Sequence, residues 1–125
     1  MPLTSGKWTV NINGNVTTLQ INPVDSSGAV TAALQGALIS DVSPFSGFWD
    51  EDAQKLTLFP PLSLPLFEVY TGYLFTDPIN LAGVTGSVIF TLVGFVECFQ
   101  PITAFLTANT AKRSVFGWYA QIGVD

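Results

Sequence analysis

The 125-residue sequence predicts an all-β fold, an eight-stranded antiparallel up-and-down β-barrel. Turn residues recur at short intervals, and the segments between them are rich in β-branched and aromatic residues. No segment shows the 3.6-residue periodicity of an amphipathic helix. The length fits a single domain, residues 1–125, because about 100–150 residues is the commonest domain size.

The first two strands are predicted as a tight hairpin. Apolar and polar residues alternate along residues 7–12, which indicates a half-buried strand. The dipeptide Asn13-Gly14 follows, and it is typical of type I′ turns because both central residues take a positive φ. Asn15 to Ile21 is then the return strand, which Asn22-Pro23 ends.

The next three strands are separated by polar turns. A turn at residues 25–28 precedes a third strand of small and branched residues, Ala29 to Ile39. Pro44 and Gly47 predict an interruption before a short fourth strand around Phe48-Trp49. Residues 50–54 form an exposed acidic turn in this interpretation, and residues 55–59 form the fifth strand.

Three long strands complete the predicted barrel. Prolines 60, 61 and 65 remove backbone donors, so Leu58 to Leu66 is expected to be a loop or a sheet edge. The sixth strand is predicted at Phe67 to Thr76, the seventh at Val84 to Phe99 and the eighth at Ser114 to Val124.

The segment from Ile79 to Phe99 is long enough to cross a membrane as a helix, since it has 21 residues and one charge, Glu97. Its glycines and β-branched residues favour a strand instead, and no flanking Lys or Arg gives a topology signal. We therefore expect no membrane span.

The seventh predicted strand is apolar on both faces. Only 10% of all residues are charged and the mean hydropathy is +0.44, so charge is scarce for covering the outside of a monomer. An apolar outward face on a barrel indicates a partner, most simply another copy. The sequence predicts a homo-oligomer that associates through its last two strands.

Composition excludes several function classes. A net charge of −5 and a pI of about 4.2 argue against nucleic acid, since the one basic cluster is Lys112-Arg113. Histidine is absent, which removes the usual general base and metal ligand, so no metal or cofactor is predicted. Cys98 is interpreted as a buried, inert thiol. The lone cysteine and the lack of a visible signal peptide favour the cytoplasm.

The segment GKWTVNINGNVTTLQI, from Gly6 to Ile21, resembles the first hairpin of the avidins. Its Gly-x-Trp start is shared with lipocalins and fatty-acid-binding proteins, all barrels that hold a small molecule at one open end. YTGYLFTD, residues 70–77, is similar to the sixth avidin strand, and residues 118–125 are weakly similar to the last one. The resemblance covers about a third of the chain and implies that Trp8 plugs the closed end.

Biotin binding is not implied by this resemblance. The positions that match the polar ureido ligands of avidins are Val10, Gly14 and Leu34, and none has a side chain that donates a hydrogen bond. The tryptophan expected in the seventh strand is also absent from Ser87 to Phe95. The cargo is therefore expected to be another molecule, or the barrel carries none.

Three functional hypotheses follow. The first is a non-enzymatic barrel that binds a small, mainly apolar ligand in its open end. The second is a self-associating structural protein whose barrel is filled by its own side chains. The third is a small isomerase or cyclase that uses Glu97 with Tyr73. The ligand-binding candidates combine apolar surface with polar groups, and they are Asn11, Trp49, Tyr70, Tyr73, Phe75, Trp118 and Gln121.

Overall fold

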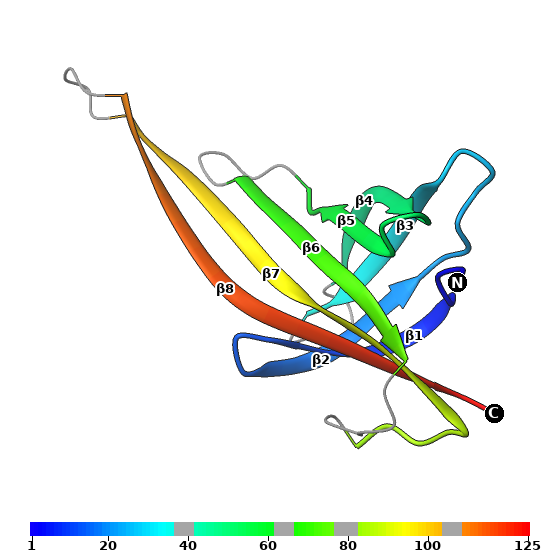
Figure 1. Cartoon of the computed structure of the whole chain (residues 1–125). Helices are drawn as coiled ribbons and strands as arrows, with labels where there is room; N and C mark the ends of the chain where they lie inside the picture. The colour runs from blue at the N-terminus through cyan, green and yellow to red at the C-terminus, as the bar shows by residue number, and fades with distance from the viewer. Residues whose placement is uncertain (37–41, 62–66, 77–82, 104–108) are drawn as a thin grey trace.

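The computed structural model describes residues 1–36, 42–61, 67–76, 83–103 and 109–125. Its eight antiparallel strands close into a barrel, which confirms the predicted fold class (Figure 1). The described residues contain no helix. The strands are β1 (Gly6–Ile12), β2 (Asn15–Ile21), β3 (Ala29–Gln35), β4 (Val42–Asp50), β5 (Lys55–Phe59), β6 (Phe67–Thr76), β7 (Val88–Thr103) and β8 (Asn109–Val124).

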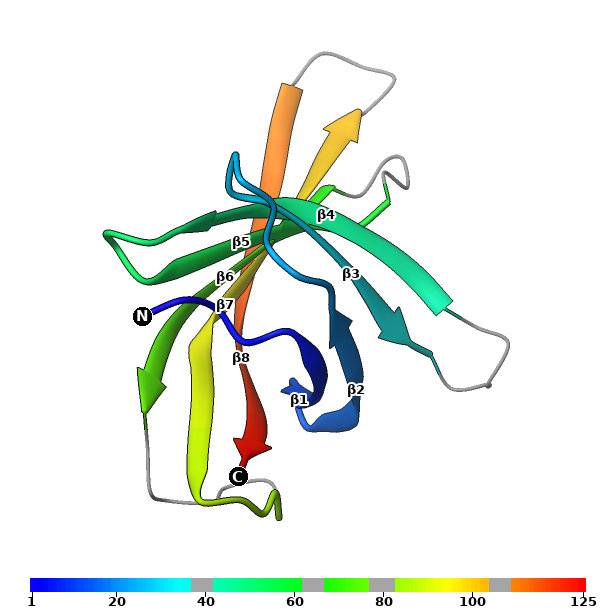
Figure 2. The same ribbon diagram turned by 90° about the vertical axis from the view of Figure 1, so that its right-hand side faces the viewer.

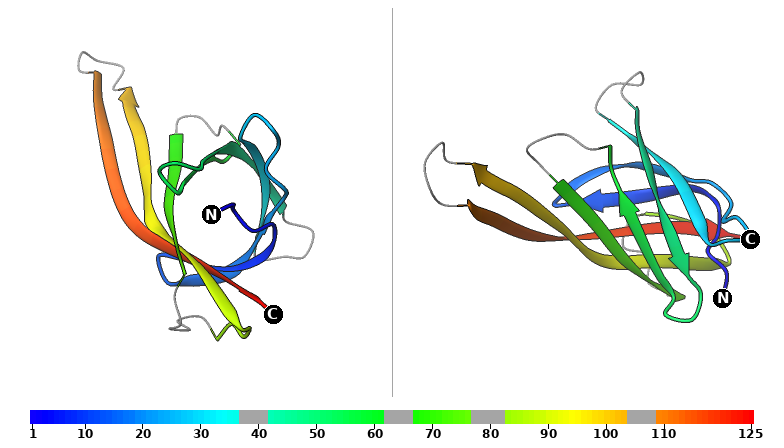
Figure 3. Two further views of the ribbon diagram at one scale, coloured as in Figure 1. Left: turned by 45° about the vertical axis from the view of Figure 1, so that its right-hand side comes forward. Right: turned by 90° about the horizontal axis from the view of Figure 1, so that it is seen from above.

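Each strand pairs with the next one along the chain, and β8 returns to pair with β1. The closing seam is short, from Thr9 opposite Gln121 to Ile12 opposite Trp118. Seen along its axis in Figure 3 (left), the barrel is a ring of strands with the N-terminal segment inside it. That segment covers one end of the barrel, which we call the closed end.

The turns follow the predicted chemistry. Asn13 and Gly14 both have positive φ, 51° and 89°, as a type I′ turn requires. Between β2 and β3, the Asp25 carboxylate accepts hydrogen bonds from the Ser27 hydroxyl at 2.6 Å and the Ala29 amide at 3.0 Å. These bonds, the hydroxyl bond above all, hold the pKa of Asp25 below its ordinary value. The acidic turn after β4 is exposed, as expected.

The prediction of a short fourth strand is wrong, because β4 contains both Pro44 and Gly47. The Trp49 amide donates to the Gly28 carbonyl on the β3 side, so the nitrogen of Pro44, five residues earlier, faces the β5 side. The β4–β5 pairing ends at Ser46, opposite Phe59. Pro44 therefore lies where no backbone donor is needed, which is how a strand tolerates proline.

The bounds predicted for the last two strands also differ from the structure. β7 begins at Val88 instead of Val84 and continues to Thr103, and β8 begins at Asn109 instead of Ser114. The β6–β7 pairing stops at Phe67 opposite Phe99. The β7–β8 hairpin continues past this point and projects away from the barrel (Figures 1 and 2). The end of the predicted third strand, at Ile39, lies outside the described residues.

The core fills the barrel from the closed end towards its middle. Leu3 is buried at 7% exposure, and Trp8, at 0%, donates from its indole nitrogen to the Thr4 carbonyl at 3.0 Å. Successive inward residues of all eight strands continue this core. Its other completely buried apolar side chains are Val10, Ile21, Val30, Leu56, Leu58, Leu92, Val96 and Ala120.

One glycine makes room for the largest side chain near the middle of the core. A Cβ atom on Gly72 would lie 2.7 Å from Cζ2 of the Trp118 ring, too close for a real contact. The Trp118 indole nitrogen donates to the Thr71 carbonyl at 3.0 Å, so the ring is also held by a buried hydrogen bond. β6 and β8 are thereby connected across the interior.

We predict that Gly72→Ala lowers the free energy of unfolding by about 1–3 kcal/mol, because the added methyl group overpacks the site against the Trp118 ring. Chemical denaturation measures this change. Gly117→Ala is the matched control, since the nearest atom to its added Cβ is 3.9 Å away. An equal loss of stability in the two variants would contradict the packing argument.

Candidate functional site

A pocket of about 580 Å³ lies at the end of the barrel opposite the N-terminal segment, which we call the open end. Its volume is in the range of small-molecule sites, roughly 300–1,000 Å³. We call it the mouth pocket, and it is lined by Ile12, Asn15, Val16, Thr17, Leu34, Gln35, Gly36 and Tyr70.

Strand alternation explains this lining. Ile12 and Leu34 share the inward face with the core residues of β1 and β3, so they are the last apolar residues before the opening. The tight turn at Asn13-Gly14 places the exposed residues Asn15 and Val16 at the rim. The Thr17 hydroxyl donates to the Gln35 carbonyl at 2.6 Å, which joins β2 and β3 beside the pocket.

An aromatic cluster lies beneath the mouth pocket. The Tyr70 ring meets the Phe45 ring edge-on, with centroids 5.2 Å apart and planes at 71°. It meets the Trp118 ring similarly, at 5.9 Å and 70°. Edge-to-face pairs of this kind are favourable because the positive ring edge approaches the negative ring face. Tyr70 is thus fixed from two sides while it lines the pocket.

A carboxylate and a thiol lie next to the Tyr70 hydroxyl on the inward face. The phenol donates to Oε2 of Glu68 at 3.4 Å, and Glu68 lies directly opposite Cys98 in the β6–β7 register. Burial, followed by the Glu68 charge and hydrogen bond, raises the pKa of both Tyr70 and Cys98. The thiol is free, and its raised pKa favours the protonated form. Cys98 is only partly buried, so the prediction of a buried thiol is wrong.

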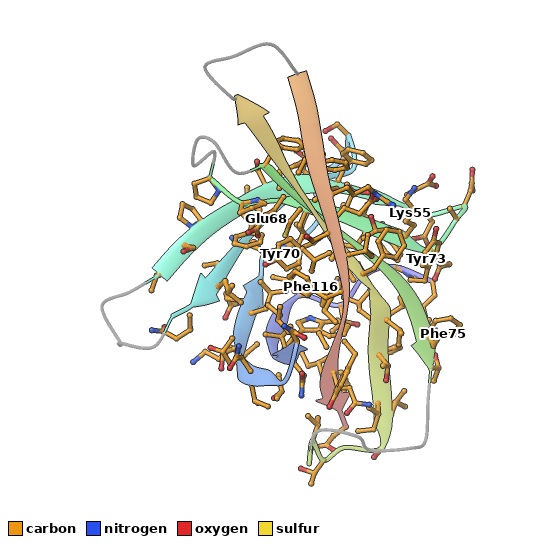
Figure 4. The ribbon with its side chains drawn as sticks, turned by 90° about the vertical axis from the view of Figure 1, so that its left-hand side faces the viewer. Lys55, Glu68, Tyr70, Tyr73, Phe75 and Phe116 are labelled. Atoms are coloured by element: carbon orange, nitrogen blue, oxygen red, sulfur yellow. The ribbon has the colours of Figure 1, made fainter. Side chains whose placement is uncertain are left out.

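The structure separates the seven predicted ligand-binding residues. Tyr70 and Trp118 meet in the aromatic cluster. Trp49 is inward and 8% exposed, but its indole nitrogen donates to Glu51 near the closed end, at 2.6 Å. Tyr73 and Phe75 are 40% and 53% exposed and point away from the interior, and Tyr73 lies beside Lys55 in Figure 4.

Asn11 and Gln121 lie on the outer face of the closing seam, and they hydrogen-bond within the protein. The Asn11 amide donates to the Tyr119 hydroxyl at 3.4 Å, and its side-chain oxygen accepts from the Gly14 amide at 2.9 Å. Gln121 is completely buried and donates to the Thr91 hydroxyl at 3.0 Å. Asn11 therefore connects β1 to β8 across the seam, Gln121 connects β8 to β7 beside it, and neither residue lines the mouth pocket.

The pair that we considered for catalysis, Glu97 and Tyr73, also lies outside the barrel. Arg113 contacts Oε2 of Glu97 through Nε at 2.9 Å and through a terminal nitrogen at 2.8 Å. Glu97 is therefore paired with a neighbouring cation on the outer face. The inward carboxylate–tyrosine pair is Glu68 with Tyr70. The sequence could have identified this pair, because strand alternation along residues 67–76 places Glu68, Tyr70 and Leu74 on one face.

A second hollow, of about 310 Å³, lies on the outer face over the first four strands, between Lys7, Gln20 and Val42. It is smaller, and none of the aromatic residues named above lines it. Within the described residues, no group of three His, Cys, Asp or Glu side chains is placed to hold a metal ion. The same residues include no helix that is long and apolar enough to cross a membrane.

Comparisons with protein-family models, with curated proteins and with solved structures find no match to this chain.

The buried phenol predicts a specific pH dependence. Because the folded pKa of Tyr70 lies above its ordinary value of 10.0, the folded state favours the neutral phenol. The resulting stabilisation is complete below about pH 10 and is lost as the pH rises towards the folded pKa. Between pH 8 and pH 11, we expect the wild-type Tm to fall at least about 3 °C further than that of Tyr70→Phe.

Thermal unfolding followed by circular dichroism measures the change of Tm with pH for the wild type and for Tyr70→Phe. Tyr73→Phe removes an exposed hydroxyl from the outer face and should follow the wild type. Parallel slopes for wild type and Tyr70→Phe would show that the Tyr70 phenol is not held neutral by its surroundings.

Proposed function

We propose that the protein is a non-enzymatic binding protein that holds a small, mainly apolar molecule in the mouth pocket. The observation that carries this proposal is the pocket itself, which has apolar walls at Ile12 and Leu34 and the Tyr70 cluster beneath it. Below that cluster, the interior is filled by buried side chains. The ligand is therefore limited to the open half of the barrel. A cytoplasmic location is part of the same proposal.

The avidin-like resemblance of residues 6–21 supports the choice of the open end. The same positions argue for a cargo other than biotin. Val10 is 1% exposed within the core, and Leu34 presents an aliphatic side chain to the pocket. Gly14 lies in the hairpin turn and has no side chain. A ureido group placed against these residues would lose its hydrogen bonds with water without replacement.

Filling the mouth pocket should abolish binding of a neutral apolar probe. We expect N-phenyl-1-naphthylamine to bind the wild type with micromolar affinity, and Leu34→Trp to weaken this binding at least tenfold by occupying the pocket. Probe fluorescence measures both affinities. Biotin, titrated by calorimetry, should show no binding.

Val93→Trp is the matched control, because Val93 is 43% exposed on the outer face and the larger ring meets solvent there. Its probe affinity should stay within twofold of the wild type. A loss of binding in Val93→Trp but not in Leu34→Trp would place the probe outside the barrel and contradict the proposal.

A second candidate function, self-association, is favoured by an apolar row on the outer face. Four phenylalanine rings from four neighbouring strands contact one another in sequence, with centroids 6.4, 6.4 and 6.2 Å apart. Two of the rings are strongly exposed, at 51% for Phe48 and 43% for Phe67. We call this row the aromatic ladder, and its members are Phe48, Phe59, Phe67 and Phe99.

The backbone next to the ladder supports a second copy as the occupant. In the described part of the chain, β8 pairs with β1 only from Trp118 to Gln121, so its stretch from Asn109 to Phe116 pairs with β7 alone. A free strand edge offers unpaired N–H and C=O groups to another strand. In a dimer with a two-fold axis, the β8 edge of one copy pairs with the β8 edge of the other. The unpaired backbone groups of both edges are then satisfied together.

Phe67→Asp tests this second candidate, because it places a charge in the middle of the aromatic ladder. We expect the wild type to sediment above its monomer mass of 13.4 kDa at high concentration and the variant to remain at that mass. Val16→Asp, at a site 65% exposed on β2, is the control and should associate like the wild type. A wild type that stays monomeric at every concentration would refute self-association.

A further inference from the structure

The mouth pocket lies beside an isolated negative charge. Among the inward-facing residues whose side chains the structure describes, Glu68 is the one that is charged. Figure 4 shows it together with Tyr70 and Phe116, apart from Lys55, Tyr73 and Phe75. Arg113, whose side chain the structure describes, is engaged by Glu97 on the outer face. The Glu68 charge is therefore not neutralised by an inward basic side chain of the described residues.

Tyr70 connects this carboxylate to the pocket. Its hydroxyl hydrogen is directed to Glu68, at 3.4 Å, so the phenol oxygen keeps its lone pairs for another donor. Glu68 also accepts from the Cys98 thiol, and a carboxylate has about four acceptor positions. Tyr70 and Glu68 thus both present acceptor positions behind the pocket wall.

Aromatic surface adds to the preference for positive charge. Tyr70, Phe45 and Trp118 form one cluster below the pocket, and the faces of such rings attract cations. A ligand amine that donates to the Tyr70 oxygen would also lie within a few ångströms of the Glu68 carboxylate, where the attraction is strengthened by the partly buried surroundings. A ligand carboxylate would instead meet a like charge.

We propose that the mouth pocket selects molecules with a protonated amine on an apolar body, with the amine directed to Tyr70 and Glu68 and the apolar part against Ile12 and Leu34. This inference rests on the proposed ligand-binding function and names its ligand class. It assigns Glu68, a residue outside the predicted binding set, as the residue that determines specificity.

Three probes that share one carbon skeleton test the proposal: 4-phenylbutylamine, 4-phenylbutan-1-ol and 4-phenylbutanoate. Calorimetric titrations of the wild type at pH 7 should show the amine binding at least tenfold more tightly than the alcohol, and the butanoate most weakly. In Glu68→Gln, the amine should weaken to the affinity of the alcohol, while the alcohol should change less than twofold.

Glu97→Gln is the matched control, since it changes the net charge equally but removes a carboxylate from the outer face. It should keep the preference for the amine. Equal wild-type affinities for amine and alcohol would overturn the selectivity and leave the pocket proposal standing. No binding of these three probes or of N-phenyl-1-naphthylamine would overturn both proposals. The wild-type ratio decides the question even where Glu68→Gln does not fold.

Discussion

The closing seam between β1 and β8 is the constraint on which the barrel and its pocket depend. It consists of four residue pairs, from Thr9–Gln121 to Ile12–Trp118. On its outer side, the buried Gln121 donates to Thr91 and so joins β8 to β7 beside the seam. On its inner side, the same four residues of β8 bring Trp118 over Gly72 and against Tyr70. Closure therefore positions the floor of the mouth pocket, and a shift of one residue would turn Trp118 outward.

Local chemistry explains how much of this fold the sequence could predict. Asn13-Gly14 specifies a positive φ at two residues, and few structures other than a tight hairpin accept it. Pro44 misled the prediction because its effect depends on whether a partner strand lies on the side that its nitrogen faces, and β5 ends before it reaches Pro44. The length of the β7–β8 hairpin could not be predicted from the sequence either. The side chains of β7 and β8 continue to alternate between the two faces past the point where β6 ends.

The candidate site was less predictable than the fold, for a related reason. Alternation shows which residues share a face of a strand, but not which face is inside when both are apolar. β7 is such a strand, and there Glu97 faces outward to Arg113 while Cys98 faces inward to Glu68. The sequence likewise could not show whether the barrel interior is open or filled, and the structure has one half of each kind. Large side chains close the lower half, while the upper half ends at Tyr70 below a pocket.

The two proposed functions share β6 and β7, because consecutive residues of these strands face opposite sides. Phe67 belongs to the aromatic ladder and Glu68 to the inner site, and Phe99 and Cys98 are related in the same way on the paired strand. A partner that holds the ladder also holds the backbone that positions Glu68. Any effect of association on ligand affinity must then be matched by an equal effect of the ligand on association, since coupling free energies are reciprocal. The low content of charged residues in this chain thus corresponds to two apolar regions, a filled interior and an apolar outer face, which lie on opposite sides of one sheet.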